Sequence, residues 1–139
     1  RLARHQASAL EVARWLESRP EVARVLHPAL ASHPDHSIWK RDFSGATGLF
    51  GCVLKPSSRG REQLREFLES LRFFGMGWSW GGFESLVVAS DVRGSRVATP
   101  WTEEGALLRF QIGLEDPRDL ISDLESAFAQ AGSVHLRQG

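Results

Sequence analysis

Apolar residues recur at helical spacing in three stretches of the chain. In residues 2–18, and again in about residues 60–73, they fall at i, i+3, i+4 and i+7, the spacing of a helix that buries one stripe. The third stretch begins at Asp116, an N-cap residue followed by proline at the first helical position. We therefore predict three amphipathic helices, whose stripes contain Ala9, Val12, Ala13 and Leu16, then Leu64, Phe67, Leu68 and Leu71, then Leu120, Ile121, Leu124 and Phe128.

Four short apolar runs lie between these helices and are predicted as strands, at residues 21–27, 48–55, 85–89 and 107–113. The second run is apolar at both alternating sets of positions, which is typical of a central, doubly covered strand. Residues 28–47 contain prolines and glycine and are predicted as a structured loop, and residues 74–84 fit neither periodicity. The order predicts an α+β fold, with an about four-stranded, largely antiparallel sheet and helices packed on one face.

Composition narrows the class of protein. The 139 residues suit a single domain over residues 1–139, and 17 basic residues balance 17 acidic ones, so no basic surplus favours nucleic acid. No apolar run approaches the roughly 20 residues that span a bilayer. The single cysteine, Cys52, excludes an intrachain disulfide and fits a reducing compartment. Because Cys52 lies in an apolar run, we expect a buried, unreactive thiol.

An arginine interrupts the last predicted strand. Leu108, Phe110 and Ile112 point to one face, so Arg109 and Gln111 point to the other. A buried guanidinium needs a partner, because leaving it unpaired is very costly. Two readings stay open: Arg109 pairs with a structural carboxylate, or its fork binds the carboxylate of a substrate.

Residues 75–82 form a second candidate site. Their glycines allow close approach of the backbone, Ser79 could offer its hydroxyl or backbone to an anion, and Trp78 and Trp80 could wall a pocket. Alternatively, the segment is a tight linker with both tryptophans in the core. The glycine spacing is not that of the dinucleotide-binding fingerprint.

Other candidates are weaker. His27, His33, Asp35 and His36 match no standard metal-ligand spacing and are interpreted as part of a surface or interface loop. Lys40 and Lys55 are the only lysines. Lys40 is interpreted as a packing and ion-pairing residue. Nothing in the sequence resembles a nucleophile, base and orienting residue.

Several of these segments together resemble a known family. From about His5 to Phe128 the chain is similar to the C-terminal domain of the Cys/Met-metabolism pyridoxal-phosphate (PLP) enzymes, with the motifs in the right order and at the right spacing. The family's bacterial β-lyases place tryptophan after the motif serine, as Trp80 follows Ser79 here, whereas its synthases and γ-lyases typically place leucine. The matching segments are residues 25–28 (VLHP), 39–43 (WKRDF), 45–50 (GATGLF), 79–86 (SWGGFESL) and 108–116 (LRFQIGLED).

The resemblance implies an activity and a role for each candidate site residue. It implies cleavage of L-cystathionine to homocysteine, pyruvate and ammonia, with Arg109 gripping the substrate α-carboxylate, Ser79 beside it and Trp80 shaping the pocket. Two positions depart from the family pattern and leave the exact substrate open: Trp78, where a smaller aromatic residue is common, and Gln111, where histidine or serine is usual. The alternatives are a cystathionine γ-lyase or γ-synthase, a cysteine-S-conjugate β-lyase, or a non-enzymatic module that binds a small molecule or partner.

The resemblance also implies that the PLP cofactor, its Schiff-base lysine and its phosphate site belong to a preceding large domain. The chain begins at Arg1 within a helical pattern, so we interpret it as the C-terminal part of a longer protein. Alone, it is expected to bind no PLP and to lack lyase activity. The parent is expected to be a cytoplasmic homotetramer. We expect Trp78, Trp80 and Phe83 to lie at the junction with the large domain.

Overall fold

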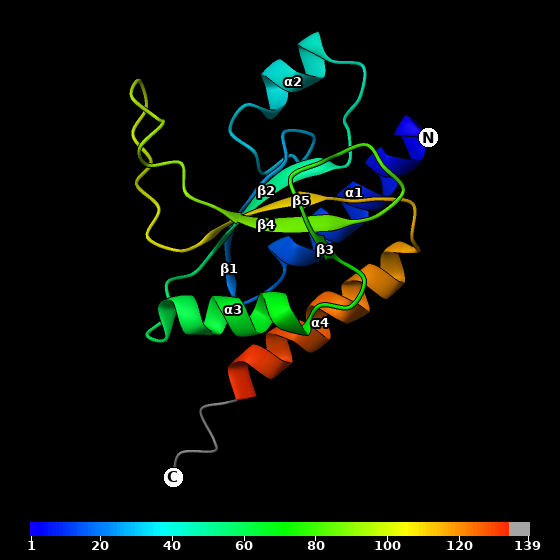
Figure 1. The fold of residues 1–139 in the computed structure, drawn as a ribbon. Coiled ribbons are helices and arrows are strands. Elements are labelled where there is room, and N and C mark those ends of the chain that lie inside the picture. The colour runs from blue at the N-terminus through cyan, green and yellow to red at the C-terminus, as the bar shows by residue number, and fades with distance from the viewer. Residues whose placement is uncertain (134–139) are drawn as a thin grey trace.

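The computed structural model describes residues 1–133, in which three long helices and a sheet form two layers (Figure 1). The elements in chain order are α1 (Leu2–Glu17), β1 (Val22–Leu26), α2 (His36–Asp42), β2 (Leu49–Leu54), α3 (Gly60–Ser70), β3 (Gly75–Met76), β4 (Leu86–Ser90), β5 (Leu107–Gln111) and α4 (Pro117–Ser133). Within residues 1–133, no helix combines the length and apolar character needed to cross a membrane.

The sheet has five strands in the order β1-β2-β5-β4-β3. Neighbouring strands are antiparallel except β3 and β4, which are parallel. The predicted α+β class and largely antiparallel sheet are confirmed. The strand count is corrected from about four to five, because β3 lies in the segment that fitted neither periodicity. With only two residues, β3 is too short to show an alternation.

The second difference is α2, which lies in a segment predicted as a loop. This seven-residue helix buries none of its side chains, so the sequence carries no apolar stripe there. Figure 1 shows α3 and α4 on one side of the sheet and α2 on the other. The helices that build the core thus share one face, as predicted, while α2 lies on the opposite side without contributing to the core.

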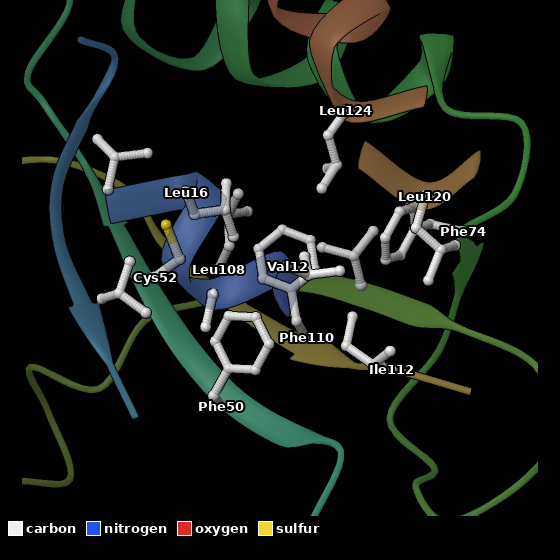
Figure 2. Close-up of a cluster of buried hydrophobic side chains, with 14 of the residues drawn as sticks. Val12, Leu16, Phe50, Cys52, Phe74, Leu108, Phe110, Ile112, Leu120 and Leu124 are labelled. Carbon is white, nitrogen blue, oxygen red and sulfur yellow. The ribbon is translucent and has the colours of Figure 1, made fainter. Parts of the chain in front are cut away.

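The core lies between the sheet and the three long helices (Figure 2). Alternate residues of the central strands point into it: Phe50 and Cys52 from β2, and Leu108 and Phe110 from β5. The predicted stripes of α1 and α4 supply the facing side chains, including Val12 and Leu124, whereas α3 buries mainly Phe67. A start of α4 at Pro117 is confirmed; Asp116 Oδ1 accepts the Arg118 N–H at 2.9 Å.

The buried His27 predicts a specific pH dependence of stability. Its Nδ1 accepts the Ala29 N–H at 3.2 Å, and its Nε2 is buried without a partner among residues 1–133. Burial, with nearby His33 and Arg14, lowers the pKa of His27 below 6.5. The unfolded chain therefore binds the extra proton more readily, and stability that is complete above pH 6.5 falls as the pH drops toward the folded pKa.

We expect urea unfolding to report this loss as at most about 1.4 kcal/mol per pH unit below pH 6.5. His27→Gln should remove that part of the pH dependence, whereas His33→Asn should retain it. Identical pH profiles for the wild type and His27→Gln would contradict the assignment.

Candidate functional site

Arg109 lies in the middle of β5 on the face of the sheet opposite the core. Its cross-strand neighbours there are Gly51 of β2 and Val88 of β4. Gly51 has no side chain, and Leu26 and Leu107 lie nearest to the position that its Cβ would take. Arg109 is half-buried and forms no salt bridge with any carboxylate of residues 1–133. The structural-carboxylate reading of Arg109 therefore finds no support in the described part of the chain.

The guanidinium instead contacts the loop between β3 and β4. This loop, residues 77–85, is called the Ser79 loop below. Nη1 of Arg109 donates to the Trp78 carbonyl oxygen at 2.7 Å, and Cζ lies 5.7 Å from the centroid of the Trp78 ring. Figure 1 shows the loop (green) arching on the same side of the sheet as α2. A guanidinium has five N–H donors, so this single hydrogen bond leaves the other donors available for another acceptor.

The structure therefore places Arg109 against the segment of the chain that contains Ser79 and Trp80. Ser79 and Trp80 directly follow Trp78, whose carbonyl binds Arg109, and both are exposed. The linker reading of this segment, with its tryptophans in the core, is wrong, since Trp78 is 63% exposed and Trp80 is 64% exposed. A guanidinium beside an exposed indole can bind a carboxylate joined to an apolar group.

Three aromatic side chains of the Ser79 loop lie on the surface, since Phe83 is 68% exposed and is thus as accessible as Trp78 and Trp80. Apolar surface of this kind usually marks an interaction site. We therefore predict that the isolated chain self-associates in sedimentation velocity as its concentration rises, and that a Trp78→Ser, Trp80→Ser, Phe83→Ser variant does not. Val97→Ser, at an apolar residue 90% exposed in another loop, is the matched control. Equal self-association of the triple variant and the wild type would contradict the prediction.

The other sequence candidates do not gather into a site. Among residues 1–133, no group of three or more histidine, cysteine, aspartate or glutamate side chains could hold a metal ion. His33 Nδ1 accepts the Asp35 N–H at 3.1 Å, and His36 Nδ1 lies 3.0 Å from the Pro28 carbonyl oxygen. These histidines therefore shape their own loop.

The expected burial of Cys52 is confirmed, and burial raises the pKa of its thiol to about 12. Thiolate chemistry at neutral pH is thereby excluded at this residue. Lys40 and Lys55 are both exposed.

Sequence reasoning missed two carboxylates, one that holds the end of the Ser79 loop and one that holds the segment before β3. Glu115 binds Ser85 at one end of the loop, with Oε1 accepting its N–H at 2.7 Å and Oε2 accepting its O–H at 2.8 Å. Just before β3, the buried Asp123 accepts the N–H groups of Arg72 and Phe73 at 2.9–3.0 Å. Both carboxylates bind partners far away in sequence, and no local pattern signals such pairs.

Comparison with known proteins places this geometry in context. Residues 1–129 match the model of a family described as Cys/Met metabolism PLP-dependent enzyme. The cystathionine β-lyase of Escherichia coli K12 is 46% identical over 133 residues, which are 94% of this chain and 33% of that protein. An L-alanine/L-glutamate racemase of Wolbachia pipientis wMel is 41% identical over 140 residues, covering 100% of this chain and 34% of that protein.

A solved structure shows the same fold. A putative O-acetylhomoserine (thiol)-lyase of Campylobacter jejuni, crystallised with N'-pyridoxyl-lysine-5'-monophosphate, superposes with a TM-score of 0.75 at 29% identity over 93% of this chain and 29% of that one. The chain therefore spans about a third of the length of the curated relatives it matches.

Proposed function

Because this chain belongs to the Cys/Met metabolism PLP-dependent enzymes, we propose that it is the substrate-recognition part of a carbon–sulfur lyase. The proposed reaction of the full-length protein is elimination of homocysteine from L-cystathionine, with one water taken up as the remainder is released as pyruvate and ammonia. Cystathionine β-lyases at 44–51% identity support the β-lyase assignment, since γ-lyases match at 35%. We further propose that the full-length protein is a cytoplasmic homotetramer.

The observation that carries the proposal is the guanidinium of Arg109. It lies opposite the core, forms no ion pair within residues 1–133, and is oriented by the Trp78 carbonyl. An arginine held in this way can bind both oxygens of an amino-acid carboxylate. Ser79, next to Trp78, would donate its hydroxyl to the same group, and Trp80 would cover the apolar part of the substrate.

We propose that PLP is not held by the residues of this chain. PLP chemistry starts from a lysine Schiff base, and both lysines of this chain, Lys40 and Lys55, are exposed. We therefore propose that a separate large domain of the full-length protein holds the cofactor, which acts as electron sink when bound. The contribution of this chain is to bind the substrate carboxylate and fix its orientation.

Assay of the full-length, PLP-loaded protein with L-cystathionine tests the proposal. Pyruvate as the keto-acid product is expected, whereas 2-oxobutyrate would indicate a γ-lyase. Because one relative is an L-alanine/L-glutamate racemase, both amino acids should be assayed in parallel. Racemisation of either one, with no pyruvate formed from cystathionine, would overturn the lyase assignment. Turnover of none of these amino acids would favour a non-enzymatic binding module.

A further inference from the structure

The base of the Ser79 loop is closed by a buried hydrogen-bond cluster. Ser85, the last residue of the loop, is 0% exposed. Its N–H and O–H both donate to the Glu115 carboxylate, at 2.7 and 2.8 Å, and its Oγ accepts the Gly113 N–H at 2.9 Å. Hydrogen bonds to an ionised carboxylate are short and strong. Glu115 therefore fixes both the backbone and the side chain of Ser85.

Both ends of the loop meet at this cluster. The Gly75 N–H of β3 donates to the Ser85 carbonyl oxygen at 2.9 Å, and the Leu114 N–H donates to the Phe83 carbonyl oxygen at 2.8 Å. The approach is so close that a Cβ on Gly113 would lie 2.2 Å from the Phe83 oxygen. Because residues 113–115 continue directly from β5, the cluster ties the loop to the strand that carries Arg109.

The rest of the loop has little support of its own. Within residues 1–133, the backbone of residues 79–82 forms no hydrogen bond, and Gly81 has a φ of +79°, which favours glycine. The hydrogen bond from Arg109 to the Trp78 carbonyl holds the stretch at its beginning, directly before Ser79. Residues 79–82 are thus held at two points, by Arg109 at the Trp78 carbonyl and by the base of the loop at Ser85.

We propose that Glu115 is a positioning residue for the substrate site. By holding Ser85, it fixes the second attachment point of the stretch that carries Ser79 and Trp80, although its carboxylate lies at the base of the loop and binds the protein instead of substrate. This inference rests on the proposed function, because it assumes that Ser79 and Arg109 receive the substrate carboxylate.

The test uses the full-length, PLP-loaded protein. Glu115→Ala should raise KM for L-cystathionine about tenfold while kcat changes less than about threefold, because binding of the carboxylate is weakened equally in the ground state and the transition state. Glu115→Gln keeps an acceptor for the Ser85 N–H and should raise KM less. Hydrogen exchange, followed by mass spectrometry on peptides that cover residues 76–85, should be faster in Glu115→Ala.

Glu66→Gln is the matched control, because Glu66 is another partly buried carboxylate and pairs with Arg59, the N-cap residue of α3, at 2.5 Å. It should change neither KM nor the exchange of the loop. If Glu115→Ala does not fold, Ser85→Ala, which removes only the hydroxyl contacts, replaces it in both measurements. In an Arg109→Lys background, Glu115→Ala should raise KM by less than about threefold. Both residues serve recognition of the same substrate carboxylate, so the effects of the two substitutions are not additive.

An unchanged KM in Glu115→Ala overturns the inference even if exchange of the loop becomes faster, as does an equal rise of KM in Glu66→Gln. A different result would contradict the proposed function. If Arg109→Lys leaves kcat/KM unchanged, the carboxylate site is wrong, while the exchange of residues 76–85 still decides whether Glu115 holds the loop.

Discussion

Replacement of Arg109 by lysine in the full-length protein is expected to lower kcat/KM for L-cystathionine about tenfold or more. Lysine keeps the positive charge but is a point donor, whereas the planar guanidinium can bind both carboxylate oxygens in parallel. Charge-assisted hydrogen bonds contribute about 1.5–3 kcal/mol, and a factor of ten corresponds to about 1.4 kcal/mol. Loss of the two-point contact is therefore enough to produce the expected change.

Steady-state kinetics and the visible PLP spectrum together check this expectation. The spectrum should stay unchanged, because the cofactor is proposed to be held by another domain. Arg24→Lys is the matched control: Arg24 is a half-exposed arginine on β1 that pairs with Glu103 at 3.1 Å, and its replacement should leave the kinetics unchanged. Unaltered kinetics in Arg109→Lys, or an altered cofactor spectrum, would count against the carboxylate assignment.

The placement of Arg109 was predictable because a strand has a period of two. Leu108, Phe110 and Ile112 are fully buried, and their alternation alone requires Arg109 to face the other way. The same reasoning located the stripes of α1 and α4, since a helix with one apolar side has only one way to bury it. Element type and facing are thus encoded locally along most of this chain.

What the sequence did not predict depends on contacts between distant residues or on elements without an apolar pattern. Glu115 and Ser85 lie 30 residues apart and meet only because β4 and β5 are neighbours in the sheet. A glutamate near a helix start is equally typical of a solvated first turn. The two-residue β3 owes its existence to pairing with β4, and the partner of such a strand cannot be read from its own residues.

The alternation along β5 also predicts different roles for the adjacent residues Arg109 and Phe110. Phe110 is 0% exposed and contacts the rings of Phe50 and Phe74, with centroids 5.5 and 5.6 Å away. Its removal leaves a cavity at the centre of the core shown in Figure 2. We expect Phe110→Ala to lower the free energy of unfolding of this chain by about 3–5 kcal/mol.

That loss is a large share of the roughly 5–15 kcal/mol that typically stabilises a domain, so Phe110→Ala should shift the urea midpoint strongly or prevent folding. Phe43→Ala is the matched control, because Phe43 is 64% exposed and surface replacements usually change stability by less than about 0.5 kcal/mol. Phe110→Leu, which leaves a smaller cavity, should fall between the two and keeps the comparison measurable if the alanine variant does not fold.

Arg109→Lys should leave the urea midpoint close to that of the wild type, because its guanidinium binds a single carbonyl on the exposed side of the sheet. Equal midpoints for Phe110→Leu and Phe43→Ala would mean that the core is not centred on β5. A midpoint for Arg109→Lys as low as that of Phe110→Leu would mean that Arg109 serves the fold. In the proposed division of β5, the inward residues pack the sheet against the helices and the outward arginine binds substrate. Such a result would contradict that division.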